Sequence, residues 1–208
     1  FCVQRRMIVL GGMTGSCKTR ILQHIKSLGH QVIDLEGLAN HKGSAFGALG
    51  HPPQPSSEHF ANLLFDRLKE ISSDQPVWFE DESRNIGTVF MPDDFYCNLQ
   101  NASTIILEIN SDLRVPLLMQ EYATYPPDQL KESVLKVSKR LGGDNTKDVV
   151  NAVNAGDFRK AVEIMLHYYD KTYKFSLSRK HPKNIIYVET DTIDIETNAL
   201  KVLKASND

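Results

Sequence analysis

An eight-residue segment between a short apolar run and an amphipathic helix constrains the fold of this chain most. The segment is GMTGSCKT, residues 12–19, and the apolar run Met7–Leu10 precedes it. From Lys18 onward, apolar residues recur at helical spacing up to Leu28, and the next residue, Gly29, is a candidate C-cap. A buried strand, a turn of small residues and a helix in this order are the pattern of a phosphate-binding loop.

Each part of this pattern has a physical role in holding an anion. Small residues let consecutive backbone N–H groups curl round a phosphate, and the helix N-terminus adds partial positive charge. Lys18 supplies a mobile cation for the terminal phosphates and is a predicted catalytic residue, while Thr19 supplies a hydroxyl for Mg²⁺. The predicted phosphate-binding residues are Gly12, Met13, Thr14, Gly15, Ser16, Cys17, Lys18 and Thr19.

Cys17 departs from the pattern, which has glycine at this position. A side chain here is expected to crowd the phosphates or to strain the backbone. A thiol beside a lysine at a helix N-terminus is also expected to have a lowered pKa, which we state as a hypothesis.

Acidic residues end two of the predicted strands. Glu80 and Asp81 follow the apolar run Val77–Phe79, and an acid at this place commonly holds Mg²⁺. Asp81 is the better fit and a predicted catalytic residue, with Glu80 as the alternative metal ligand beside Thr19. A pair of exposed acids with no metal is the competing interpretation.

A substrate crevice is predicted at the same edge of the sheet. Asp34 and Glu36 end the second predicted strand, and His41 and Lys42 lie in the adjoining loop. Ligands of open α/β sheets bind at the carboxyl ends of the strands, where these residues are expected. Arg84, in the loop after the third strand, is the third predicted catalytic residue.

Strands and helices alternate along most of the chain. Apolar runs predict strands at 7–10, 32–35, 77–79, 105–109 and 185–188, a loop at 37–55, and a helix from Ser56. About 75 residues before the last strand have helical spacing, including one helix over 130–141 and another that begins after Asp157. We predict a P-loop NTPase-like three-layer α/β fold with a mostly parallel sheet of about five strands. Residues 1–110 and 184–208 form the expected core, and 111–183 the helical insertion.

Charge is distributed unevenly along the chain. The net charge is −2, yet residues 131–183 hold 12 Lys and Arg against 6 Asp and Glu, a balance of +6. This basic segment is either a solvated helical surface or a surface for a polyanion.

Three cysteines, Cys2, Cys17 and Cys97, lack the spacing of a disulfide framework or a zinc site. No apolar run reaches the length of a membrane helix, and no secretory signal opens the chain. A cytoplasmic protein without membrane contact is therefore expected. Because the first residue is Phe1, we interpret the chain as a piece of a longer protein.

Several stretches together resemble one family. They are GGMTGSCKT (11–19), QVIDLEGLANHKGSAFGALG (31–50), PPQPSSEHF (52–60), FEDESRNIG (79–87), KRLGG (139–143) and GDFRKAVEIMLHYYDKTY (156–173). They resemble the C-terminal P-loop part of bacterial tRNA 2-selenouridine synthases. The stretch DLEGLANHKGSAFG is far more specific than the phosphate loop, which many unrelated proteins share.

The resemblance implies an activity on tRNA. Such enzymes attach a geranyl group from geranyl diphosphate to wobble-position 2-thiouridine, and then replace the geranylthio group with selenium from selenophosphate. The family carries an N-terminal rhodanese-like domain with a catalytic cysteine, and none of the three cysteines here takes that role. The fragment alone is therefore expected to be incomplete.

The resemblance also implies roles for the insertion. Its helices are expected to offer an apolar groove for the prenyl chain, and its cations to contact tRNA. His167, Tyr168, Tyr169 and Tyr173 either stack on an unpaired base or belong to the core. The predicted tRNA-binding residues are Lys136, Lys139, Arg140, Arg159, Lys160, Lys171 and Lys174.

Two other functions fit the same pattern. A small-molecule kinase, of the nucleoside or nucleotide type, would hold ATP in the loop and its acceptor near Asp34 or Glu36. A non-catalytic module that senses tRNA or a nucleotide would explain a loop weakened by Cys17.

Overall fold

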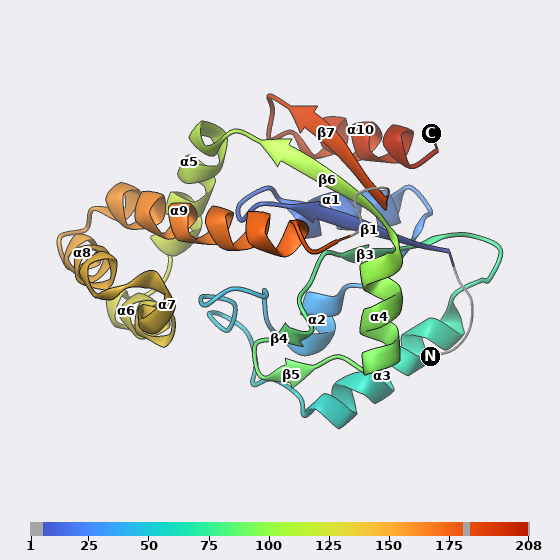
Figure 1. Ribbon diagram of the computed structural model, residues 1–208, viewed down its shortest axis with the longest axis horizontal. Helices are drawn as coiled ribbons and strands as arrows, with labels where there is room; N and C mark the ends of the chain where they lie inside the picture. Colours follow the sequence, from blue (N-terminus) through green and yellow to red (C-terminus); the bar gives the residue numbers. More distant parts are fainter. Residues whose placement is uncertain (1–5, 181–183, 208) are drawn as a thin grey trace.

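A five-stranded parallel sheet forms the centre of the molecule (Figure 1). The computed structural model describes residues 6–180 and 184–207, so Cys2 lies outside the described residues. The strands stand in the order β2-β3-β1-β6-β7. Their bounds are β1 Met7–Gly12, β2 Gln31–Val32, β3 Val77–Glu80, β6 Ser103–Ile109 and β7 Ile185–Thr190.

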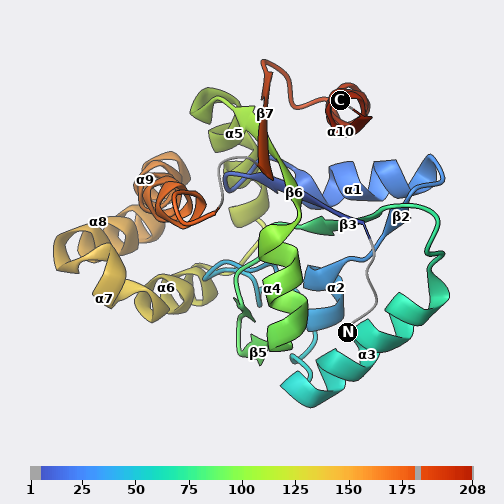
Figure 2. The ribbon, with the colours of Figure 1, turned by 45° about the vertical axis from the view of Figure 1, so that its right-hand side comes forward.

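Alternating side chains on the central strands build a core on each face of the sheet. Ile8, Leu10 and Trp78 pack on one face against α1 (Lys18–Ser27) and α10 (Ile195–Asn207). Val9 and Phe79 pack on the other face. That second face is covered by α2 (Leu35–Ala39), α3 (Ser57–Glu70), α4 (Asp93–Asn101) and the hairpin β4 (Asn85–Ile86)–β5 (Val89–Phe90). Figure 2 shows the sheet between these two layers, which confirms the predicted three-layer fold.

Among the described residues between β6 and β7, five helices form a group beside the sheet (Figures 1 and 2). They are α5 (Ser111–Tyr122), α6 (Pro127–Lys136), α7 (Ser138–Leu141), α8 (Gly143–Asn154) and α9 (Phe158–Leu177). We call this group the insertion. It has its own apolar core, which also includes Phe46 from the loop after α2. The loop after α2 therefore connects the layer below the sheet with the core of the insertion.

The structure corrects several predicted elements. The strand predicted at 32–35 ends at Val32, because Asp34 caps α2 by accepting a hydrogen bond from Gly37 N–H. The helix predicted over 130–141 is interrupted at Val137 and becomes α6 and α7. The hairpin β4–β5 lies within a region where the sequence predicts no strand. The side chains of Ser56 and Asp157 cap α3 and α9, since each accepts a hydrogen bond from the first turn of its helix.

None of the helices in the described part of the chain is both long and apolar enough to cross a membrane.

Candidate functional site

The loop between β1 and α1 has the shape of an anion-binding nest. Gly15 and Cys17 both have left-handed backbone conformations, with φ of 83° and 59°. Lys18 Nζ donates to Gly12 O at 2.8 Å, which folds the lysine over the loop. Within the described residues, the N–H groups of Gly15, Lys18 and Thr19 donate to no other residue. These donors are therefore free for a ligand.

A cleft of about 880 Å³ opens in front of this loop. Thr14–Arg20 forms one wall, and α5 and α9 of the insertion form the opposite wall. The insertion contributes an apolar and aromatic surface with Leu117, Leu118, Tyr122 and Tyr169. One end of the cleft is thus rich in hydrogen-bond donors, and the facing wall has an apolar and aromatic part. The same wall also carries Gln120, Glu121, Thr172 and Ser176.

Thr19 lines the cleft and touches two carboxylates, of which Glu36 also lines the cleft and Glu80 is buried beneath it. Its Oγ1 donates to Glu80 Oε1 at 2.6 Å and lies 3.1 Å from Glu36 Oε2. Burial, reinforced by the Glu36 carboxylate, raises the pKa of Glu80 to about 8. Burial also raises the pKa of Glu36.

This donor set fits the predicted Mg²⁺. Among the described residues, no three His, Cys, Asp or Glu side chains form a group that could hold a metal ion alone. Mg²⁺, however, is commonly held by one or two carboxylates together with phosphates and water. The hydroxyl of Thr19 and the carboxylate of Glu80 are hard oxygen ligands of the required kind.

Asp81 is engaged elsewhere, which corrects the expectation that it is the better metal ligand. Its Oδ1 pairs with Lys180 Nζ at 2.6 Å, and its Oδ2 accepts from Tyr173 Oη at 3.0 Å. Both members of the ion pair are buried. Because neighbouring residues of a strand point to opposite faces, Glu80 points to the α1 side and Asp81 to the α9 side.

The Cys17 thiol also differs from expectation. Burial raises its pKa above the ordinary value, and this outweighs the lowering effect of Arg20 and Lys18. The hypothesis of an acidified thiol is therefore wrong for this structure. The expectation of backbone strain is consistent with the left-handed conformation of Cys17.

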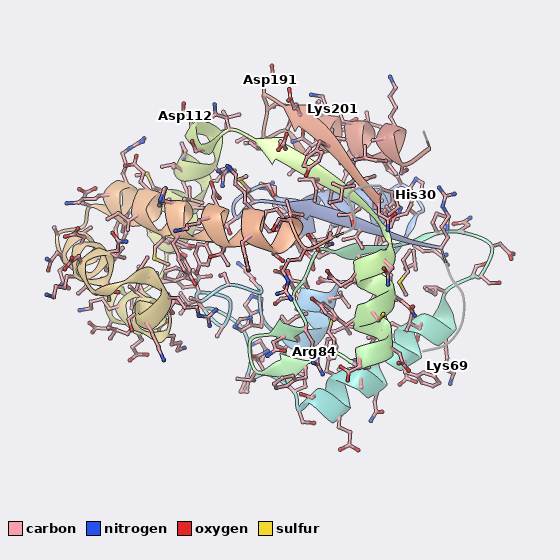
Figure 3. All side chains as sticks on the ribbon, viewed as in Figure 1. His30, Lys69, Arg84, Asp112, Asp191 and Lys201 are labelled. Atoms are coloured by element: carbon pink, nitrogen blue, oxygen red, sulfur yellow. The ribbon has the colours of Figure 1, made fainter. Side chains whose placement is uncertain are left out.

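The predicted crevice residues are only partly brought together. Asp34, Glu36 and Lys42 line the cleft. His41 is buried beneath the following loop, where its Nδ1 accepts from Gly43 N–H, and it does not line the cleft. Arg84 lies beside the β4–β5 hairpin, pairs with Asp93 and is also absent from the lining (Figure 3). Arg84 is therefore not placed for catalysis.

The loop over residues 40–55 connects the core to the insertion across the cleft. Lys42 Nζ pairs with Glu121 Oε1 at 2.5 Å, and Ala45 N–H donates to Tyr169 Oη at 3.1 Å. The ring of Phe46 packs on Tyr122 with centroids 4.6 Å apart. The most specific stretch of the sequence thus forms a wall of the site.

The seven predicted tRNA-binding cations are all exposed. They are spread over α6, α7 and α9, and Arg159 pairs with Glu163 one turn along. None of the seven is among the residues that line the cleft. Of the four candidate stacking residues, Tyr169 and Tyr173 line the cleft with their hydroxyls hydrogen-bonded.

Sequence reasoning missed the buried polar contacts that join the insertion to the phosphate loop. Arg114 of α5 forms a two-pronged ion pair with Asp170 of α9 and also donates to Thr14 O. Tyr173 Oη accepts from Gly12 N–H at 2.8 Å. A signal for Arg114 was present in the sequence, because it is the first cation after the predicted strand 105–109.

Comparison with known proteins identifies the family. A family model described as tRNA 2-selenouridine synthase AAA domain matches residues 5–200. The chain belongs to this family. Proteins named tRNA 2-selenouridine synthase from Nitrosomonas europaea and Shewanella frigidimarina are 31% and 32% identical to it, over 86% and 91% of its length. The chain spans only 58% and 59% of the length of these two family members.

Solved structures share the fold at low sequence identity. A protein named tRNA delta(2)-isopentenylpyrophosphate transferase from Staphylococcus epidermidis has a TM-score of 0.52 at 11% identity, and the matched regions cover 98% of this chain and 99% of that one. The tRNA isopentenylpyrophosphate transferase of Bacillus halodurans has a TM-score of 0.51 at 12% identity, with 98% and 99% coverage. At such identity, the likeness concerns the fold alone.

Proposed function

We propose that this chain is the diphosphate-binding part of an enzyme that converts wobble-position 2-thiouridine of tRNA to 2-selenouridine through an S-geranyl intermediate. Membership of the family supports the tRNA substrate. The observation that carries the proposal is the cleft itself, in which free N–H donors and Lys18 face an apolar wall. A diphosphate joined to an apolar chain matches both surfaces.

In the proposed prenyl transfer, the sulfur of 2-thiouridine forms a bond to the first carbon of the geranyl group. The carbon–oxygen bond breaks, and diphosphate leaves with the electron pair, while the nucleoside loses its proton to solvent. Negative charge therefore grows on the diphosphate as the reaction proceeds. Preorganised donors at that position lower the barrier, because they interact more strongly with the developing charge.

Different residues of the chain bind the diphosphate, the prenyl chain and the metal ion. The N–H groups of the loop and Lys18 bind the diphosphate, and the aromatic wall of the insertion excludes water from the prenyl chain. Thr19 and Glu80 would hold Mg²⁺, which supplies further positive charge to the leaving group when bound. The acidic side chains near the loop would repel the diphosphate in a direct contact, because both are negatively charged.

The replacement of the geranylthio group by selenium needs more than this chain. We propose that selenophosphate is the donor, and that a rhodanese-like domain in the remaining length of the full protein takes part. The whole enzyme is proposed to act in the cytoplasm, where its tRNA substrate is found.

The proposal is tested by Lys18→Ala in the full-length protein. Geranyl transfer to tRNA should fall by about 10²–10³-fold, the usual cost of removing one group that stabilises transition-state charge. Lys26→Ala is the matched control, because Lys26 is an exposed lysine at the other end of the same helix. Geranyl transfer that survives Lys18→Ala unchanged would remove the loop from the chemistry.

The same protein incubated with ATP and nucleosides addresses the kinase alternative. We expect no phosphoryl transfer to nucleosides. Turnover of ATP that depends on Lys18 and on an added acceptor would replace the proposed function with a kinase activity.

A further inference from the structure

Arg114 is buried behind the phosphate loop and forms hydrogen bonds with all three nitrogens of its guanidinium group. Its Nε donates to Ile109 O at 3.0 Å, which ties α5 to the end of β6. Its two terminal nitrogens contact the Asp170 carboxylate at 3.0 and 2.7 Å. One of them also donates to Thr14 O at 3.0 Å. The side chain of Arg114 is 3% exposed, whereas that of Asp170 is 23% exposed.

The contact with Thr14 fixes one peptide group of the loop. In a planar trans peptide, the C=O of one residue and the N–H of the next point in opposite directions. Arg114 does not line the cleft, whereas Thr14 and Gly15 do. Because Arg114 holds Thr14 C=O on the far side of the loop, the N–H of Gly15 is directed away from Arg114 and into the cleft.

The surroundings of Gly15 agree with this orientation. A Cβ atom at Gly15 would lie 3.1 Å from Leu118 Cδ1 and 3.3 Å from Arg114 Cβ, so the loop rests directly on α5. The Gly15 N–H donates to no other described residue. An aimed donor without a partner is what a bound phosphate oxygen requires.

We propose that Arg114 is a positioning residue, which orients the Thr14–Gly15 peptide so that the Gly15 N–H binds the diphosphate. This inference rests on the proposed function and adds a residue from the insertion to the phosphate site. Arg114 acts through the backbone and does not touch the ligand. The insertion thereby sets the shape of the loop.

The test must distinguish loss of stability from loss of loop orientation. The single variant Arg114→Met cannot do this, because it would leave the Asp170 carboxylate unpaired and destabilise the fold. The double variant Arg114→Met/Asp170→Leu removes both charges and keeps apolar bulk, a replacement that is often neutral for stability. Asp170→Asn is the matched control. It weakens the ion pair but leaves the bond from Arg114 to Thr14 in place.

The experiment measures the affinity of the protein for inorganic pyrophosphate with Mg²⁺ by calorimetry, and the amide shift of Gly15 by NMR. In wild type, pyrophosphate should move the Gly15 amide signal downfield. The double variant should stay folded, bind roughly tenfold more weakly and lose most of that shift, since about one hydrogen bond to a charged ligand is misaligned. Asp170→Asn should be less stable yet bind within about twofold of wild type.

Three results would overturn the inference while leaving the proposed function standing. They are wild-type affinity in the folded double variant, an equal loss of affinity in Asp170→Asn, and no Gly15 shift in wild type that binds pyrophosphate. If the double variant does not fold, Arg114→Lys decides, because lysine cannot reach Thr14, Ile109 and Asp170 together. Wild-type affinity in Arg114→Lys, with the downfield shift of the Gly15 amide lost, would then refute the proposal. Wild-type protein that binds no pyrophosphate would instead refute the proposed function and the basis of this inference with it.

Discussion

At the scale of single residues, Cys17 carries strain that its neighbours do not. Its φ of 59° and ψ of 25° lie in the left-handed region, where a Cβ atom crowds the following carbonyl. The helix α1 begins directly after it, so the chain cannot relax this conformation without moving Lys18. Glycine would adopt the same conformation without the clash.

We predict that Cys17→Gly is more stable than Cys17→Ala by about 0.5–1 kcal/mol. Relief of left-handed strain stabilises the glycine variant by about 1–2 kcal/mol. The greater freedom of glycine in the unfolded chain offsets about 0.4–1 kcal/mol of this gain. Both variants lose the thiol, so its packing cancels in the comparison. Urea denaturation measures the difference, and an alanine variant as stable as the glycine variant would contradict it.

At the scale of elements, α9 approaches β1 so closely that only glycine fits between them. A Cβ atom at Gly11 would lie 2.5 Å from Tyr173 Oη. That hydroxyl accepts from Gly12 N–H and donates to Asp81, so it links α9 to β1 and to the residue after β3. Burial, with the neighbouring Asp81 carboxylate, raises the pKa of Tyr173 well above its usual range. The hydroxyl therefore stays protonated as a donor.

Tyr173→Phe should lower the free energy of unfolding by about 1–3 kcal/mol, because it leaves a buried donor and a buried acceptor without this partner. Tyr168→Phe is the control on the same helix, since no hydrogen bond joins the Tyr168 hydroxyl to another described residue. Its effect should stay within about 0.5 kcal/mol. Equal losses in the two variants, measured by urea denaturation, would show that the hydroxyl network contributes nothing specific.

At the scale of the whole molecule, positive charge is concentrated in residues 131–183, which hold 12 Lys and Arg against 6 Asp and Glu, although the chain is acidic overall. Arg140 of α7 is exposed and acts on Tyr169 in the cleft, and Lys139 is exposed beside it. Under the proposed function, a tRNA backbone would lie across α6 and α7, and its modified base would enter the cleft.

Replacing Lys139 and Arg140 by alanine should weaken tRNA binding and reduce the slope of log affinity against log salt by about 1–2. Arg67→Ala/Lys69→Ala is the matched control, because it removes the same two charges from exposed positions on α3. Binding titrations at several salt concentrations measure both variants. An unchanged slope in the insertion variant, or an equal change in the control, would exclude this surface.

The sequence predicts much of the site, and it could also have indicated that Glu80, rather than Asp81, contacts Thr19. The strand, the loop and the helix around Lys18 follow from local sequence, because each needs only its own residues. Trp78 and Glu80 are two residues apart, so both must point to the face that α1 covers. That alternation alone favours Glu80 over Asp81 as the partner of Thr19, and the structure has this contact.

By itself, the sequence determined the phosphate loop, the parallel sheet, the place of the insertion and the family, since all of these are written in short stretches of neighbouring residues. Only the tertiary structure decided which side chains meet across the cleft. Arg114 lies 100 residues from Thr14, and Tyr173 lies 161 residues from Gly12. No local pattern encodes such contacts, because they exist only after helices that are far apart in the chain have packed together.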